Sequence, residues 1–130
     1  EKLLEDPLAM TVRPTATSAV RNARNRDEFV RRVREATGFR VEVIDGDREA
    51  GLIHRGVSLG TPLGDGISLI MDIGGGSVEF ILCDRRRIFY KQSFEIGGQR
   101  LTDRFVTADP MPPVQVGRLA DFLDEQLLPL

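Results

Sequence analysis

Cysteine, histidine and long apolar runs are scarce in this chain of 130 residues, and each scarcity excludes a class of protein. The single cysteine, Cys83, excludes an internal disulfide framework and favours a reducing, cytoplasmic setting. With one histidine and one cysteine, the chain has no zinc-type ligand cluster. Apolar runs such as residues 67–73 are far too short to span a bilayer, so we expect no membrane partner. The formal net charge of −2 argues against a general nucleic-acid binder.

What is present is typical of a globular domain, with 41% apolar and 29% charged residues. Hydrophobic periodicity predicts the element order β-α-β-α-β-β-β-α-α, which indicates a mixed α/β layered domain. We expect strands near residues 8–16, 40–44, 67–73, 77–83 and 88–94, and helices near residues 17–37, 47–60, 98–106 and 114–128. The three consecutive strands between residues 67 and 94 predict a β-meander.

Helix boundaries are marked by residues with known end preferences. Asn25, with Glu28 three residues later, predicts a capping box at the start of a helix. Gly38 predicts its end, because glycine tolerates the left-handed conformation of that position. The segment Asp45-Gly46-Asp47 predicts a turn that leads into the next helix.

The glycine-rich segment from Asp72 to Ser77 is the strongest local signal. Consecutive glycines expose backbone N–H groups and allow positive φ angles, so such a turn can hold an anion without cationic side chains. A Walker loop would need a lysine after the last glycine, and a dinucleotide-binding loop would need a helix. Here a β-branched, alternating segment follows, so the turn joins two strands of a hairpin.

The position of two carboxylates depends on the length of that turn. If Gly74 and Gly75 are its two central residues, Asp72 pairs with Ser77, and Asp72, Ser77 and Glu79 share one face of the hairpin. Two carboxylates beside an N–H concavity could hold Mg²⁺. A three-residue turn would place Glu79 on the opposite face. The alternative is a merely tight hairpin with both carboxylates solvated.

Three segments resemble one known family. Residues 71–79 resemble the second phosphate-binding motif of the exopolyphosphatase / guanosine pentaphosphate phosphohydrolase (Ppx/GppA) family, which belongs to the actin–Hsp70–sugar kinase superfamily. Residues 16–25 resemble its ATSAxRxARN segment and residues 43–53 its VISGxEEAxLI segment, in the family's order. The resemblance implies an α/β fold of ribonuclease H-like (actin-like ATPase) type, here a partial lobe in which helices flank a mixed sheet with a β-meander.

By position, the resemblance also implies roles for individual residues. Glu49 matches the catalytic base that activates water to attack the terminal phosphorus. Asp72 and Glu79 match acidic residues associated with Mg²⁺. The phosphate loop is matched by Gly74, Gly75, Gly76 and Ser77. A segment that lines the site is matched by Ser18 and Arg21, and Arg21 could pair with phosphate oxygens.

The chain departs from the family pattern in two ways. The first is substitution: Arg48 replaces one acid of the family's acidic pair before Ala50, and Gly51 replaces the arginine that usually follows Ala50. The second is absence. The family's first phosphate loop and second lobe do not occur in these residues. The resemblance therefore places residues 1–130 as a single partial domain, the latter half of the first lobe, and we expect no phosphate release from this chain alone.

The function that we expect is hydrolysis of terminal phosphate from inorganic polyphosphate or guanosine pentaphosphate, with Mg²⁺ as cofactor and a homodimer as the full-length form. Two alternatives stay open: a non-catalytic phosphate- or nucleotide-sensing domain of the same superfamily, and a structural or interaction domain. Glu49 favours the enzyme, because a sensor needs no water-activating base. On residue chemistry alone, the favoured interpretation of Glu49 is instead a solvated carboxylate of a first helical turn, because charged residues are mostly exposed.

Two arginine clusters have both plain and functional interpretations. Arg31, Arg32 and Arg34 are either the wet face of a helix or a polyanion track. The run from Arg85 to Arg87 falls at a predicted hairpin turn, where the interpretations are simple solvation or contact with polyphosphate. Cys83 alternates within a strand and is expected to be an inert, packed thiol.

Overall fold

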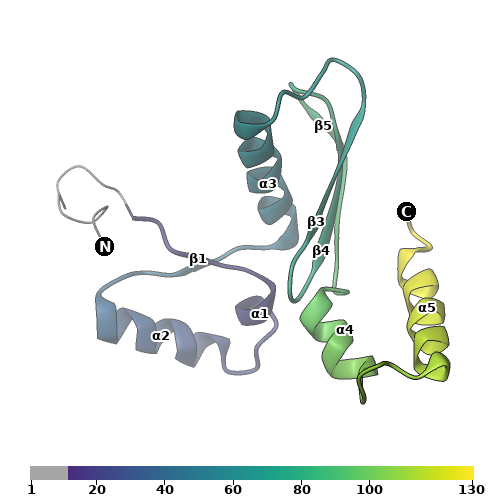
Figure 1. The fold of residues 1–130 in the computed structure, drawn as a ribbon. Coiled ribbons are helices and arrows are strands. Elements are labelled where there is room, and N and C mark those ends of the chain that lie inside the picture. The colour runs from purple at the N-terminus through teal and green to yellow at the C-terminus, as the bar shows by residue number, and fades with distance from the viewer. Residues whose placement is uncertain (1–11) are drawn as a thin grey trace. The chain divides into compact units, whose positions relative to one another are not determined.

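The computed structural model describes residues 12–130, and its contacts divide the chain into two compact units, Glu1–Ile44 and Asp45–Leu130 (Figure 1). The strand expected near residues 8–16 lies partly outside the described residues. The single partial domain expected from the sequence stays a prediction.

The N-terminal unit is a small βαβ arrangement. Strand β1 (Thr15–Ala16) pairs in parallel with β2 (Glu42–Val43), and the connection between them contains α1 (Ser18–Arg21) and α2 (Arg26–Thr37). Parallel strands need such a crossover, because a short hairpin can join only antiparallel strands. The order expected from the sequence is confirmed here, although each strand is only two residues long.

The two ends of α2 test the predicted boundaries. Gly38 ends the helix with φ +76°, and its N–H donates to Arg34 O at 2.9 Å, as expected for a left-handed C-terminal residue. Asn25 precedes the helix, but its side chain makes no capping hydrogen bond. The predicted capping box with Glu28 is therefore wrong, because Asn25 has φ −101° and ψ 24° rather than the extended backbone that directs a capping side chain at the first amides.

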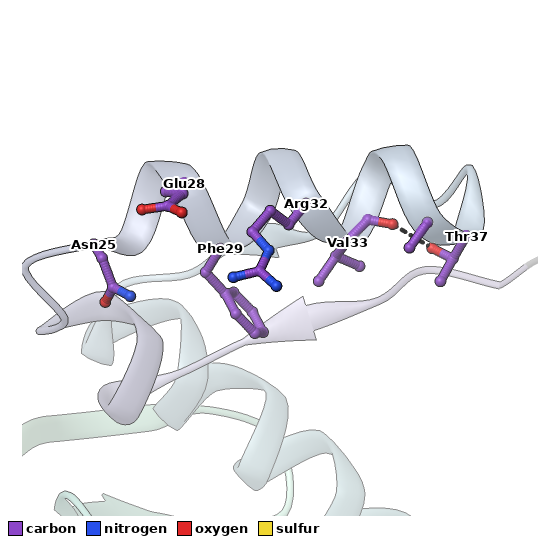
Figure 2. A pocket seen from close by; sticks show the side chains of 7 residues that line it. Asn25, Glu28, Phe29, Arg32, Val33 and Thr37 are labelled. Carbon is purple, nitrogen blue, oxygen red and sulfur yellow. Dashed lines mark hydrogen bonds between the residues drawn. The ribbon is translucent and has the colours of Figure 1, made fainter.

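An open hollow of about 410 Å³ runs along one side of α2 (Figure 2). Its apolar lining repeats at helical spacing, as an amphipathic helix requires. It contains none of the predicted site residues. The lining residues are Asn25, Glu28, Phe29, Arg32, Val33, Ala36 and Thr37.

The C-terminal unit contains helix α3, a three-stranded antiparallel sheet of order β3-β4-β5, and helices α4 and α5 (Figure 1). The β-meander and the mixed α/β fold expected from the sequence are confirmed, with the parallel and antiparallel strands in two separate sheets. No helix within residues 12–130 has the length and apolar character required to cross a membrane. The bounds are α3 Gly46–Gly60, β3 Ser68–Ile73, β4 Val78–Cys83, β5 Ile88–Phe94, α4 Gly98–Phe105 and α5 Pro113–Leu127.

Alternation along β4 gives the sheet two packed faces. Ile81 and Cys83 are fully buried against Ala50 of α3. Val78 lies on the opposite face and packs with Phe94, together with residues of α4 and α5. Because side chains of a strand alternate between faces, Glu79 lies on the same face as Ile81, towards α3.

The hairpin register differs from the one expected. Asp72 pairs with Glu79 and Ile73 with Val78, so residues 74–77 form a four-residue loop and the two-residue turn is wrong. Since the loop is longer by two residues, the parity of the strands is unchanged. Asp72 and Glu79 therefore lie directly opposite each other on one face, and their predicted shared face is confirmed.

Candidate active site

The loop of residues 74–77 is held by the beginning of α4. The Gly98 amide donates to Gly74 O at 2.9 Å and the Arg100 amide to Gly75 O at 3.1 Å. The first N–H groups of a helix have no partner within the helix itself. Here the loop carbonyls provide those partners, and no side chain caps α4.

Gly97, just before α4, makes a third backbone contact with the loop. Its amide donates to Gly76 O at 3.3 Å, and Arg100 Nε donates to the same oxygen at 3.0 Å. A Cβ atom on Gly97 would lie 2.5 Å from the N and C atoms of Gly76 and from Gly75 C. Only glycine allows the two backbones to approach this closely.

The orientation of the loop carbonyls determines that of its amides. In a trans peptide the N–H points opposite to the preceding C=O. With the carbonyls of Gly74, Gly75 and Gly76 directed at α4, the N–H groups of Gly75, Gly76 and Ser77 point away from it. Among residues 12–130, these three amides donate to no other group. Successive amides directed to one side form a concavity suited to an anion.

A polar row crosses the sheet two residues from the loop, beyond the pair Ile73–Val78. Asp72, Glu79 and Ser93 pair across β3, β4 and β5 in one register. Glu79 is only 1% exposed, and its Oε1 accepts a hydrogen bond from Ser93 Oγ at 2.7 Å. Asp72 is exposed. The row therefore joins one buried, hydrogen-bonded carboxylate to one carboxylate open to solvent.

The first turn of α3 lies over this row. A Cβ on Gly46 would lie 2.6 Å from Ser93 Cβ, so the helix backbone rests on the Ser93 side chain. Two residues earlier on β5, Lys91 Nζ donates to Asp47 Oδ2 at 2.8 Å and to Asp47 O at 3.1 Å. The N-terminal end of α3, with its partial positive charge, thus packs on the serine that bonds the buried carboxylate.

Glu49 belongs to the same first turn of α3. Asp45 fixes this turn, because its Oδ1 accepts from the Arg48 amide at 2.8 Å and its carbonyl from the Glu49 amide at 3.0 Å. Glu49 precedes the fully buried Ala50 and is itself half-buried. The helix entry expected over residues 45–47 is confirmed, with α3 beginning at Gly46 after the capping residue Asp45. The role of Glu49 as a base stays a prediction.

Ser18 and Arg21 lie in the N-terminal unit. Ser18 is buried and accepts a hydrogen bond from Asn22 Nδ2 at 3.3 Å, while Arg21 Nη1 donates to Ile44 O at 3.0 Å. Their expected contact with phosphate stays a prediction, because the glycine loop belongs to the other unit.

Two carboxylates of the polar row, Asp72 and Glu79, are the residues expected to bind Mg²⁺. Within residues 12–130, no group of three or more histidine, cysteine, aspartate or glutamate side chains is arranged to hold a metal ion. Magnesium sites that share their ion with substrate phosphates need only one or two protein carboxylates, completed by water. Asp72 and Glu79 provide the required number of carboxylates on one face of the sheet, and Mg²⁺ stays a prediction.

Sequence reasoning missed several residues that shape the site. Ser93 bonds the buried carboxylate, Arg100 bonds a loop carbonyl, and Gly46 and Gly97 permit close backbone contacts. The only local signal for Ser93 was its alternate position on a strand, which also fits an exposed serine. For Gly97, the signal was the glycine pair before a helix.

Two titratable groups at the other end of β4 have shifted affinities for protons. Burial, followed by the nearby charge of Asp84, raises the pKa of the Cys83 thiol, which supports the inert packed cysteine expected from the sequence. Hydrogen bonds from the amides of Arg86 and Arg87 lower the pKa of Asp84. The folded chain therefore favours the charged form of this carboxylate.

Known proteins match this arrangement over most of the chain. Exopolyphosphatase 1 of Mycobacterium leprae is 37% identical over 112 residues, which cover 86% of this chain and 33% of that protein. The bifunctional 3-dehydroquinate synthase/phosphatase of Fusobacterium nucleatum is 41% identical over 92 residues, or 69% of this chain and 14% of that protein. This chain therefore spans a third or less of these two relatives.

Solved structures agree with the sequence matches. An exopolyphosphatase from Cytophaga hutchinsonii is similar with a TM-score of 0.90 and 48% identity, covering 98% of this chain and 41% of that chain. The PPX-GPPA enzyme of Aquifex aeolicus has a TM-score of 0.74 and 32% identity, covering 97% and 42%. The sequence model of the Ppx/GppA phosphatase family matches residues 1–130. The chain therefore belongs to the Ppx/GppA phosphatase family and has its actin-like ATPase fold.

Proposed function

We propose that the protein carrying this chain is a phosphohydrolase that releases terminal phosphate from inorganic polyphosphate. The observation that carries the proposal is the set of three loop amides, from Gly75 to Ser77, that point away from α4 with no other acceptor among residues 12–130. Relatives from Mycobacterium leprae and Cytophaga hutchinsonii are named exopolyphosphatases, which supports polyphosphate as the substrate.

The loop amides would bind the oxygens of the terminal phosphate. Phosphoryl transfer depends mainly on positioning and on neutralising the negative charge of the transferred group. Fixed amides serve this purpose because α4 already holds their peptide planes through hydrogen bonds to Gly74 O and Gly75 O. Little reorganisation is then required when the charge develops.

Glu49 would orient and deprotonate the attacking water. Its backbone is fixed in the first turn of α3, which packs on the row that contains Glu79 and Ser93. A positioned base typically contributes about 10²–10⁴-fold to the rate.

Asp72 and Glu79 would hold Mg²⁺, which supplies charge neutralisation on the phosphate oxygens when it is bound. In the chain itself, the Ser93 hydroxyl holds one oxygen of the Glu79 carboxylate at 2.7 Å. This hydrogen bond restricts the orientation of Glu79. The second carboxylate, that of Asp72 on the opposite strand, is exposed to solvent.

The test uses this chain extended to the length of its relatives. Glu49→Gln should reduce phosphate release from polyphosphate by about 10²–10⁴-fold, because the amide cannot accept a proton. Tripolyphosphate should still shift the amide resonances of Gly75, Gly76 and Ser77. Glu125→Gln, at an exposed site on α5, is the matched control and should keep full activity.

Two results would contradict the proposal at different points. Full phosphate release by Glu49→Gln would remove that residue from the role of base. Loop amides unmoved by tripolyphosphate would remove the glycine loop from phosphate binding. Comparing turnover of polyphosphate with that of guanosine pentaphosphate tests the substrate, and binding without turnover of either would favour a sensing domain.

A further inference from the structure

A second basic site lies at the end of β4 opposite the glycine loop. The hairpin between β4 and β5 carries Arg85, Arg86 and Arg87, and it borders a hollow of about 330 Å³ against the later turns of α3. We name this hollow the hairpin pocket. Its lining residues are His54, Arg55, Ser58, Leu59 and Arg85.

The backbone of this hairpin is held rigidly. Asp84 Oδ1 accepts from the amides of Arg86 at 2.7 Å and Arg87 at 2.8 Å, and the Asp84 amide donates to Arg87 O at 3.0 Å. Such side-chain bonds to the following amides are how aspartate fixes a turn. His54 Nε2 donates to Asp84 O at 3.1 Å and ties the turn to α3. These hydrogen bonds therefore fix the backbone from which the arginine side chains extend.

Positive charge exceeds negative charge at this hairpin. Arg85 Nε pairs with Asp65 Oδ1 at 2.6 Å. Arg87 Nε lies 3.9 Å from Asp84 Oδ2, and the Arg87 guanidinium lies 4.7 Å from the centre of the Phe89 ring. Within residues 12–130, the guanidinium groups of Arg55 and Arg86 have no acidic partner. In a chain of formal net charge −2, this local excess of guanidinium groups gives the hairpin a positive potential that suits an anionic ligand.

The hairpin pocket and the glycine loop lie at opposite ends of the same scaffold. The six residues of β4 separate them by about 20 Å, at about 3.3 Å per residue. Helix α3 follows the same direction, because Gly46 packs on Ser93 near the loop and His54 bonds Asp84 at the hairpin. Arg55 thus lies about 9 Å along the helix axis beyond Glu49.

We infer that the hairpin pocket is a second anion site, which binds a distal part of a long linear polyphosphate whose terminal phosphate occupies the glycine loop. This inference rests on the proposed function. Guanidinium groups suit phosphate because their planar donors match its oxygens. Single-stranded nucleic acid is a poorer fit, because such sites stack successive bases on large aromatic side chains and the pocket lining contains no Phe, Tyr or Trp.

The test compares long-chain polyphosphate with tripolyphosphate, which is far shorter than the span between the two sites. The protein is again this chain at the length of its relatives. Arg55→Ala and Arg86→Ala should each weaken long-chain binding about two- to fivefold, as loss of one exposed ion pair does. The double variant should also show a shallower salt dependence, because fewer counterions are released. Tripolyphosphate binding should stay unchanged in every variant.

Arg118→Ala is the matched control, since Arg118 is an exposed arginine on α5 away from the hairpin, and it should bind both ligands as the parent does. If tripolyphosphate leaves the loop amides unmoved, the proposed function fails. If it binds the loop but the Arg55 and Arg86 variants bind long chains like the parent, only this inference fails. An oligonucleotide that binds as tightly as polyphosphate, with the same loss in these variants, would overturn the assignment to polyphosphate.

Discussion

Gly97→Ala should displace the glycine loop, because the added methyl group would enter a space bounded by backbone. Its Cβ would lie 2.5 Å from Gly76 N, Gly76 C and Gly75 C, a separation that real Cβ contacts essentially never show. Gly97 has φ −63°, which alanine adopts easily, so the effect is steric rather than conformational. The loop or the beginning of α4 must therefore move.

The magnitude follows from two contributions. Forcing one extra carbon into a packed site costs about 1–3 kcal/mol. The movement would also lengthen the hydrogen bonds from Gly97 N to Gly76 O, at 3.3 Å, and from Gly98 N to Gly74 O, at 2.9 Å. Each such bond is worth about 0.5–1.5 kcal/mol. We expect a loss of about 2–4 kcal/mol in the free energy of unfolding, together with weaker phosphate binding by the loop amides.

Urea unfolding measures the loss of stability, and tripolyphosphate titration followed at the amides of Gly75 to Ser77 measures the loss of binding. Gly117→Ala is the matched control. It places the same methyl group in the middle of α5, where no atom lies within 4 Å. Because alanine is favoured over glycine inside a helix, this control should be more stable by about 0.5–1 kcal/mol.

The steric reasoning would be refuted by a Gly97→Ala protein that unfolds at the urea concentration of the parent and binds tripolyphosphate with equal affinity. That result would mean that the loop and α4 separate without cost, so the carbonyl contacts do not hold the amides in place. Equal destabilisation by Gly117→Ala would also contradict it, because the effect would then not depend on the close backbone approach.

Two further predictions concern the carboxylates on β4 and at its end. Ser93→Ala removes the hydroxyl that bonds the buried Glu79 carboxylate, so urea unfolding should show a loss of about 1–3 kcal/mol in the free energy of unfolding. Ser68→Ala on β3 is the control. Equal losses in the two variants would show that the hydrogen bond to Glu79 adds no stability. Asp84 has a lowered pKa in the folded state, so its stabilisation is present above its ordinary pKa and is lost as pH falls through the lower folded value. Asp84→Asn should therefore flatten the acid limb of the stability curve, and an unchanged acid limb would refute the contribution of this charge.

The sequence predicted those features that depend on neighbouring residues along the chain. Alternation marked the strands of the meander, and helical spacing around Ala50 marked α3. Gly38 and Asp45 marked helix ends because each acts on amides or carbonyls a few positions away. The capping box predicted at Asn25 was wrong, because its backbone conformation, and not its residue type, prevents its side chain from capping α2.

The site was predictable only in part. Strand parity was enough to place Asp72 and Glu79 on one face, although the expected turn was two residues too short. Exposure could not be read from alternation, because Asp72 lies on an edge strand and is exposed while Glu79 lies on the central strand and is buried. The partner of Glu79 comes from a third strand, so its hydrogen bond depends on a register that the sequence does not state.

By itself, the sequence determined the order of helices and strands, the glycine loop and its resemblance to a phosphate-binding motif, because these depend on residue type and spacing. Tertiary structure alone decided which way the loop amides point. Their direction follows from the contact of α4 with the loop carbonyls, made about 20 residues further along the chain. A glycine permits many backbone conformations, and only packing against Gly97 and Gly98 selects the one that can bind an anion.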